Sequence, residues 1–206
     1  MIEVWEKVVE LLEKFYAERG RKFPWRREKS PFKVLVAEVL LQKTPASRCV
    51  ESYEELLKKY PSCEALASAP DEELKSIFSR LGLFKRAKWL KEACSVVLEE
   101  FDGNIPLEES ELKRLKGVGS YTARATSLAL RGRGKLPVDA NVKRVLGRLG
   151  IPKDEWEHLV ITREAFYGLI DLAASVCKGK NPKCESCPLF VLCKFASANV
   201  KSSLKE

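Results

Sequence analysis

Apolar residues recur every three or four positions along most of the chain, which is the spacing that gathers them on one face of an α-helix. No stretch keeps the apolar–polar alternation of a half-buried strand. The pattern therefore predicts an all-α protein. The clearest stripes are Val4, Val8, Leu11, Leu12 and Phe15; Phe32, Leu35, Val36, Val39 and Leu40; Leu74, Ile77, Phe78 and Leu81; Ala87, Leu90, Cys94, Val97 and Leu98; and Val142, Val145, Leu146 and Leu149.

Proline, glycine and serine divide these stripes. Ser30-Pro31 suits a helix cap followed by the first helical residue, and Gly103, Pro106 and Gly132 mark connections. A chain of 206 residues with 45% apolar content can build one large domain or two small ones. Because no apolar run approaches the ~18 residues of a membrane span and the N-terminus does not resemble a secretory signal, we expect a cytoplasmic protein.

Charge adds a weak indication of the ligand. The 37 lysines and arginines exceed the 29 acidic residues and give a net charge of +8, which is the sign expected of a protein that binds a polyanion. Many basic proteins bind no nucleic acid, so charge alone does not identify a nucleic-acid-binding protein.

Four of the seven cysteines are clustered near the C-terminus with the spacing C-x6-C-x2-C-x5-C, at Cys177, Cys184, Cys187 and Cys193. In a reducing compartment such clustering favours a metal site over disulfides. Four thiolates suit either a [4Fe–4S] cluster or zinc. The intervening segment, 178–183, is too rich in Lys, Asn and Pro to be a core, which argues against four merely buried thiols.

Basic residues surround these cysteines, at Lys178, Lys180, Lys183 and Lys194. They would offset the negative charge of a cluster ligated by thiolates. They could equally form a solvated face or contact phosphates.

Leu115-Lys116-Gly117-Val118-Gly119 separates two helical patterns. Two glycines permit a tight turn that exposes backbone N–H groups at the start of the next helix, and such a helix start can bind phosphate. A plain αα-hairpin is the alternative, although one glycine would suffice for it.

These motifs together resemble the iron–sulfur helix-hairpin-helix DNA glycosylases of the HhH-GPD superfamily, over about Phe23 to Cys193. The resemblance implies two helical lobes. Residues 26–137 would form a six-helix lobe that contains the hairpin, and residues 1–25 with 138–206 would form a second lobe that carries a [4Fe–4S] cluster loop. It also implies that Asp139, twenty residues after Gly119, is the catalytic aspartate, although the same residue could cap the helix that follows it.

Within the superfamily, Phe23-Pro24-Trp25-Arg26 and the segment 37–44 are similar to the MutY adenine glycosylases and the Mig-type thymine glycosylases. Glu38 would be their catalytic glutamate, and its place beside an apolar helix face predicts partial burial and a raised pKa. An exposed helical glutamate is the alternative. Tyr121 lies where endonuclease III carries a Schiff-base lysine, so we expect weak or absent lyase activity.

The resemblance assigns further roles. Asp139 would stabilise the cationic sugar, Glu38 would handle protons or position water, and Tyr121 would line the pocket. Gln42 would fill the space left by a flipped nucleotide and Leu83 would wedge beside the widowed base, although Leu83 and Phe84 could instead be core. The predicted DNA contacts of the hairpin are Lys116, Gly117, Val118 and Gly119.

Ala140, where MutY enzymes usually have Gly, and the short stretch after Cys193 favour the thymine/uracil branch, so we expect removal of T, and also U, opposite G in double-stranded DNA. The absence of a lysine at Tyr121 predicts a monofunctional glycosylase, and we expect it to act as a monomer on a prokaryotic chromosome. Removal of adenine opposite G or 8-oxoguanine is the alternative. A different class, a non-catalytic DNA-binding iron–sulfur module, would not need Glu38, Tyr121 and Asp139 together.

Overall fold

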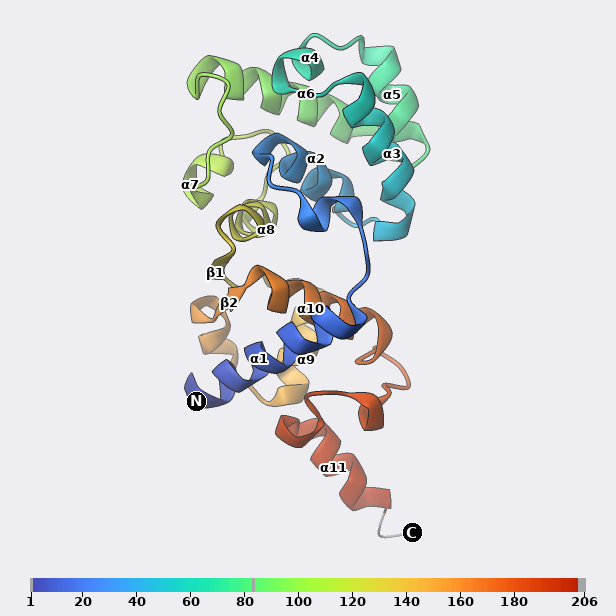
Figure 1. The fold of residues 1–206 in the computed structure, drawn as a ribbon, viewed down its shortest axis with the longest axis vertical. Coiled ribbons are helices and arrows are strands. Elements are labelled where there is room, and N and C mark those ends of the chain that lie inside the picture. Colours follow the sequence, from blue (N-terminus) through green and yellow to red (C-terminus); the bar gives the residue numbers. More distant parts are fainter. Residues whose placement is uncertain (1, 83, 204–206) are drawn as a thin grey trace. The chain divides into compact units, whose positions relative to one another are not determined.

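The computed structural model describes residues 2–82 and 84–203 and confirms a mostly helical chain (Figure 1). It forms two compact units. Unit 1 comprises the chain up to Arg21 and from Gly132 onward, and unit 2 runs from Lys22 to Arg131. The sequence placed these boundaries at 25/26 and 137/138. The later one falls at Gly132 because the strand that follows it pairs within unit 1.

Unit 2 is helical around one apolar core. Its largest fully buried side chains include Leu35, Leu40, Leu56, Phe78 and Leu90. Its elements are η1 (Pro24–Arg27), α2 (Pro31–Leu41), α3 (Ala46–Lys59), α4 (Cys63–Ala67), α5 (Asp71–Ser79), α6 (Phe84–Glu100), α7 (Glu109–Leu112) and α8 (Ser120–Arg131).

Helix α2 lies in the interior of unit 2 and packs against α3, α6 and α8. It begins at Pro31 as the sequence predicts, but the Ser30 hydroxyl makes no capping hydrogen bond. The Glu28 carboxylate instead accepts the backbone N–H groups of Lys29 and Ser30, each at 2.9 Å. The start of α2 is therefore fixed by the chain before it, and this sets where Glu38 lies.

Unit 1 joins the N-terminal helix to the C-terminal part of the chain. Helix α1 packs along α10, and a Cβ atom built on Gly168 would lie 2.2 Å from the Leu12 carbonyl oxygen, so a glycine is needed at this contact. The elements are α1 (Ile2–Arg19), β1 (Arg133–Lys135), α9 (Ala140–Leu149), η2 (Lys153–His158), β2 (Val160–Thr162), α10 (Arg163–Ser175), η3 (Cys184–Ser186), η4 (Phe190–Leu192) and α11 (Lys194–Ser203).

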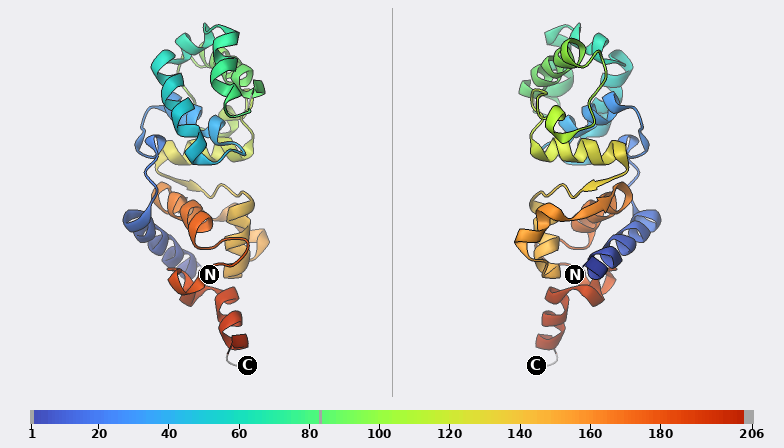
Figure 2. Two further views of the ribbon diagram at one scale, coloured as in Figure 1. Left: turned by 90° about the vertical axis from the view of Figure 1, so that its right-hand side faces the viewer. Right: turned by 90° about the vertical axis from the view of Figure 1, so that its left-hand side faces the viewer.

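An ion pair with a buried carboxylate holds the chain just after α1. The Asp171 carboxylate, which is 2% exposed, accepts the Arg21 Nε–H at 2.5 Å and the Arg21 backbone N–H at 2.8 Å. Arg21 is the last residue before the chain enters unit 2. The pair therefore holds the chain where it leaves the unit. Figure 2 shows α11, in red, extending away from the rest of unit 1.

The sequence did not predict the two short strands. β1 and β2 pair antiparallel, with Gly134 opposite Ile161. Three residues are too few for an alternating pattern to stand out from helical stripes on either side. None of the described helices has both the length and the apolar character needed to span a bilayer.

Candidate functional site

Glu38 occupies the third turn of α2 with buried residues on both sides, Ala37 and Val39. Glu38 as a whole is partly exposed, but its carboxyl group is buried. This burial raises the pKa of Glu38 to about 7. The nearby Arg26 guanidinium opposes the shift and lowers the pKa. The predicted rise in pKa is thus confirmed, and a carboxyl with this pKa exchanges protons near neutral pH.

The burial of Arg26 and its position near Glu38 were not predicted from the sequence. It belongs to η1 and is 7% exposed. Its guanidinium lies over the Phe23 ring, 5.4 Å from the ring centroid, and the Phe23 ring in turn stacks on Trp25 at 5.1 Å. The aromatic residues of Phe23-Pro24-Trp25-Arg26 therefore hold a buried cation near Glu38. A motif so rich in aromatic residues beside an arginine was the available signal.

The hairpin joins α7 to α8 and is tied to α2. The Gln42 side-chain amide donates to the Gly117 carbonyl oxygen at 2.8 Å and to the Thr122 hydroxyl at 3.1 Å. Gln42 is one helical turn beyond Glu38, and Tyr121 precedes Thr122 on α8. The structure therefore brings three predicted site elements of unit 2 together: the glutamate helix, Gln42 and the hairpin. Tyr121 is 38% exposed.

The two hairpin glycines differ in their backbone conformation and in their surroundings. Gly117 has a φ of +80°, and a Cβ atom there would lie 3.0 Å from the Trp89 side chain, so the fold itself requires a glycine. A Cβ atom on Gly119 would meet none of the described residues within 4 Å. Val118, predicted to contact DNA, is 5% exposed, and its N–H donates to the Leu115 carbonyl oxygen. Lys116 and Gly119 are exposed.

Leu83 lies outside the described residues. Its neighbour Phe84 begins α6 and is 58% exposed, which excludes the core role that the sequence left open for it. An aromatic side chain at this end of α6 is thus available to a partner molecule.

Asp139 belongs to unit 1 and caps α9, as its position in the sequence suggested. One carboxylate oxygen, Oδ1, accepts the Val142 N–H at 2.8 Å, and the other, Oδ2, accepts the Asn141 side-chain amide at 3.2 Å. Two donors thus fix the orientation of the carboxylate. Glu38 and Asp139 lie in different units, and their convergence stays a prediction.

Helix α9 also holds the cysteine loop through two arginines that sequence reasoning missed. Arg144 donates to the carbonyl oxygens of Ala173 and Cys177, both at 3.0 Å, and to the Asn141 side-chain oxygen at 3.0 Å. Arg148 donates to the Cys177 Sγ at 3.3 Å and to the Lys178 carbonyl oxygen at 2.6 Å. The side chain that orients one Asp139 oxygen is therefore bound to an arginine that also holds the loop.

All four predicted ligands, Cys177, Cys184, Cys187 and Cys193, line one small cavity. Burial first, and then the neighbouring thiols, raise the pKa of Cys187 to about 11. No three His, Cys, Asp or Glu side chains among the described residues are arranged to hold a metal ion. The four thiols nonetheless share one cavity. The flanking Lys178, Lys180, Lys183 and Lys194 are exposed.

Comparison with known proteins gives a consistent picture. The profile of the "HhH-GPD superfamily base excision DNA repair protein" family matches residues 36–166. A thymine/uracil-DNA glycosylase of Pyrobaculum aerophilum is 38% identical over 196 residues, which cover 85% of each chain. An adenine DNA glycosylase of Mycobacterium tuberculosis is 33% identical, but the matched part is only 63% of that protein. The solved structure of a thermostable thymine-DNA glycosylase superposes with a TM-score of 0.83 at 28% identity, covering 95% of this chain and 98% of the other.

Proposed function

Because this chain belongs to the HhH-GPD superfamily of base excision DNA repair proteins, we propose that it is a monofunctional DNA glycosylase that removes T, and also U, opposite G. The observation that carries the proposal is its similarity, over 85% of both chains, to a relative named thymine/uracil-DNA glycosylase. The similar adenine DNA glycosylase shares a smaller part of its length. Double-stranded DNA in the cytoplasm, bound by a monomer, is the corresponding partner.

Three side chains of this protein would serve the reaction. When the bond between the sugar C1′ and the base nitrogen breaks, positive charge develops on the sugar and negative charge on the base. The fixed Asp139 carboxylate stabilises the sugar cation, and protonated Glu38 gives its proton to the departing pyrimidine. A water oxygen then bonds to C1′, and its proton returns to the Glu38 carboxylate. Tyr121 lines the pocket and offers no amine for a Schiff base.

A non-catalytic DNA-binding module is less consistent with Glu38. A carboxyl group held in a dehydrated environment costs stability once it ionises, and strongly shifted groups of this kind gather at functional sites. A purely structural helix would gain from an apolar residue there.

DNA contact by the hairpin is supported by Gly119. Among the described residues, no atom lies within 4 Å of the position that a Cβ atom on Gly119 would take, and Gly119 immediately precedes the start of α8 at Ser120. The N–H groups at a helix start can bind phosphate. A glycine at this place allows a phosphate to approach the backbone closely. The exposed Phe84 ring, next to the predicted wedge position 83, is an apolar group of the kind that unstacks bases.

The four thiols fit a [4Fe–4S] cluster. All four line one cavity, and four cysteine thiolates are the usual ligand set of such a cluster. The Arg148 guanidinium beside the Cys177 sulfur would offset the negative charge of the bound cluster. When bound, the cluster supplies a cross-link of the C-terminal loop, and catalysis is left to the carboxyl groups.

The substrate proposal is tested by incubating the protein with labelled duplexes that contain T·G, U·G, A·G or A·8-oxoguanine, followed by alkali and strand sizing. We expect breaks at T·G and U·G alone. Asp139→Asn should lower turnover by about a thousandfold or more while retaining binding, because the asparagine still caps α9 but carries no charge. Breaks at adenine, or near-normal turnover of Asp139→Asn, would contradict the assignment.

The pH profile tests the role of Glu38. Turnover on T·G should be level below pH about 7 and fall about tenfold per pH unit above it, because only the protonated carboxyl donates. Arg26→Gln should move this limb to higher pH, since the guanidinium lowers the pKa. Glu38→Gln should turn over slowly and show no such fall in rate at high pH. An unchanged limb in Glu38→Gln would assign it to another group.

The two glycines form a matched pair for the hairpin. Gly119→Ala should leave the free energy of unfolding within about 0.5 kcal/mol of the parent and weaken DNA binding, because its methyl group meets only the phosphate. Gly117→Ala should lose about 1–3 kcal/mol, from its left-handed φ and the contact with Trp89. Urea unfolding and duplex titration measure both. Full DNA affinity in Gly119→Ala would show that no phosphate binds beside this residue.

Metal analysis of protein purified without oxygen tests the cluster. We expect about four iron atoms per chain and broad visible absorbance. Cys187→Ser should lose both, whereas Cys49→Ser, a buried cysteine outside the loop, should keep them. One zinc atom per chain would identify a different metal centre.

A further inference from the structure

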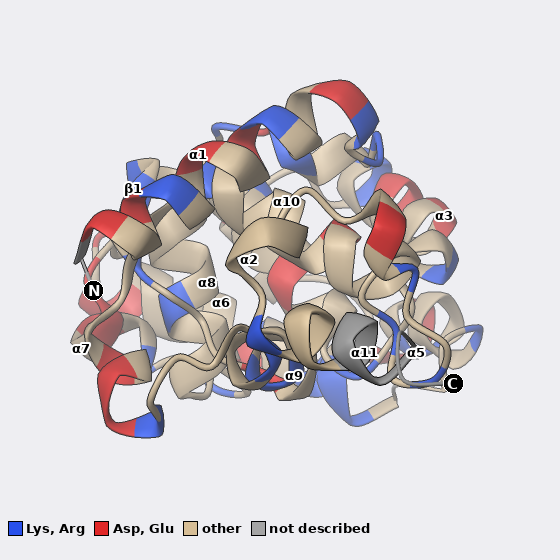
Figure 3. Cartoon of the chain, turned by 90° about the horizontal axis from the view of Figure 1, so that it is seen from below, with Lys and Arg blue, Asp and Glu red and all other residues tan. Residues whose placement is uncertain are grey.

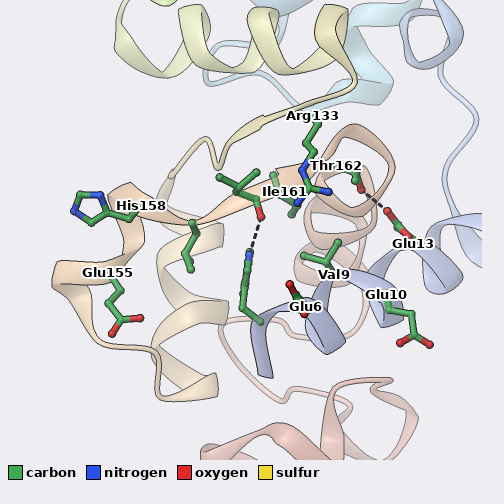
Figure 4. A pocket seen from close by; sticks show the side chains of 12 residues that line it. Glu6, Val9, Glu10, Glu13, Arg133, Glu155, His158, Ile161 and Thr162 are labelled. Atoms are coloured by element: carbon green, nitrogen blue, oxygen red, sulfur yellow. Dashed lines mark hydrogen bonds between the residues drawn. The ribbon is translucent and has the colours of Figure 1, made fainter. Parts of the chain in front are cut away.

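Unit 1 contains a pocket of about 690 Å³ that plays no part in the proposed reaction (Figure 4). Its walls come from α1, η2 and both strands, so residues far apart in the sequence form it. The volume falls within the ~300–1,000 Å³ typical of binding sites in proteins.

The floor of the pocket is apolar and held in place. Trp5, Leu159 and Ile161 contribute side chains that are at most 8% exposed. The Trp5 indole N–H donates to the Val160 carbonyl oxygen at 2.7 Å, which ties α1 to β2 and fixes the ring (Figure 4). The Val160 side chain, in contrast, is 39% exposed at the pocket. The pocket is therefore preformed and leaves apolar surface open to solvent.

The rim of the pocket is acidic. Glu6, Glu10 and Glu13 follow one another along one side of α1, and Glu155 comes from η2. Figure 3 shows acidic residues on α1, in red, alternating with basic ones. Glu10 pairs with Lys7 at 2.7 Å, and Glu13 accepts the Thr162 hydroxyl.

Two of these carboxylates, Glu6 and Glu155, form no ion pair among the described residues. Figure 4 shows that they come from different elements of the pocket wall. Arg133 and His158 are the opposing basic side chains in the lining, so carboxylates outnumber them.

This local charge is opposite to that of the whole chain, which carries +8. Four carboxylates around one opening repel phosphate groups, so the pocket is unsuited to the DNA backbone. Its chemistry instead suits a cation that also carries apolar surface.

We propose that this pocket binds a basic segment of a partner protein, which places a bulky apolar side chain on the Trp5 floor while neighbouring Lys or Arg side chains meet Glu6 and Glu155. An apolar centre with a charged rim is the anatomy of protein interfaces. The apolar surface also extends from the floor to the opening of the pocket, because Val160 in the lining is 39% exposed. A small cation would leave that surface uncovered, whereas a peptide chain covers it.

The test uses calorimetric titration of the full-length protein with a capped peptide of sequence Lys-Lys-Leu-Phe-Lys-Arg-Lys. We expect saturable binding that weakens roughly three- to tenfold in Glu6→Gln/Glu155→Gln, the effect of losing two exposed ion pairs. Val160→Ser should also weaken it. The matched control is Glu54→Gln/Glu99→Gln, which removes the same charge from exposed positions outside the pocket and should bind as the parent does.

Three outcomes would overturn the proposal. They are equal loss in the control double variant, equal binding of a peptide with Gly-Ser in place of Leu-Phe, and binding of phenethylammonium as tight as that of the peptide. The first two indicate general charge attraction and the third a small-molecule site. Base excision should be unchanged in Glu6→Gln/Glu155→Gln, so this test and that of the proposed glycosylase fail independently.

Discussion

The hydrogen bond from the Val142 N–H to the Asp139 carboxylate caps α9 and also orients a candidate catalytic group. It fixes the carboxylate at the positive end of α9, and the Asn141 amide fixes its second oxygen. Further along the same helix, Arg144 and Arg148 hold the backbone and one sulfur of the cysteine loop. A change at the loop therefore reaches the candidate catalytic group through a single rigid element, and loosening either end of α9 would disturb both.

Unit 2 supplies the complementary chemistry at a cost in stability. Ionising Glu38 in its dehydrated environment costs on the order of 3 kcal/mol, from the difference between its usual pKa of 4.5 and about 7. The folded state holds this proton more tightly than the unfolded chain, so the contribution of Glu38 to stability declines as pH rises from about 4.5 to about 7. An enzyme that needs an acid near neutral pH keeps such a residue despite that cost.

The sequence was sufficient where the evidence is local. Apolar periodicity indicated the helices, the residues around Asp139 indicated its capping role, and the position of Glu38 beside an apolar face indicated its raised pKa. It was not sufficient for contacts between distant residues. Arg148 binds a loop about thirty residues away, and nothing near it in the sequence points to that loop. Arg26 lay inside a motif already singled out, but only the fold shows the aromatic rings that hold it beside a carboxyl.

The division of the chain also bears on the order in which the protein forms during synthesis. Unit 2 is one continuous segment, so it is complete on the ribosome before the rest of unit 1 has been made. Helix α1 emerges before unit 2, yet its packing partner α10 begins only at Arg163. The apolar face of α1 must therefore remain uncovered in the nascent chain while more than a hundred residues are added, and the four predicted cluster ligands follow α10 in the sequence. A cluster could thus be inserted only after both α1 and α10 have been made.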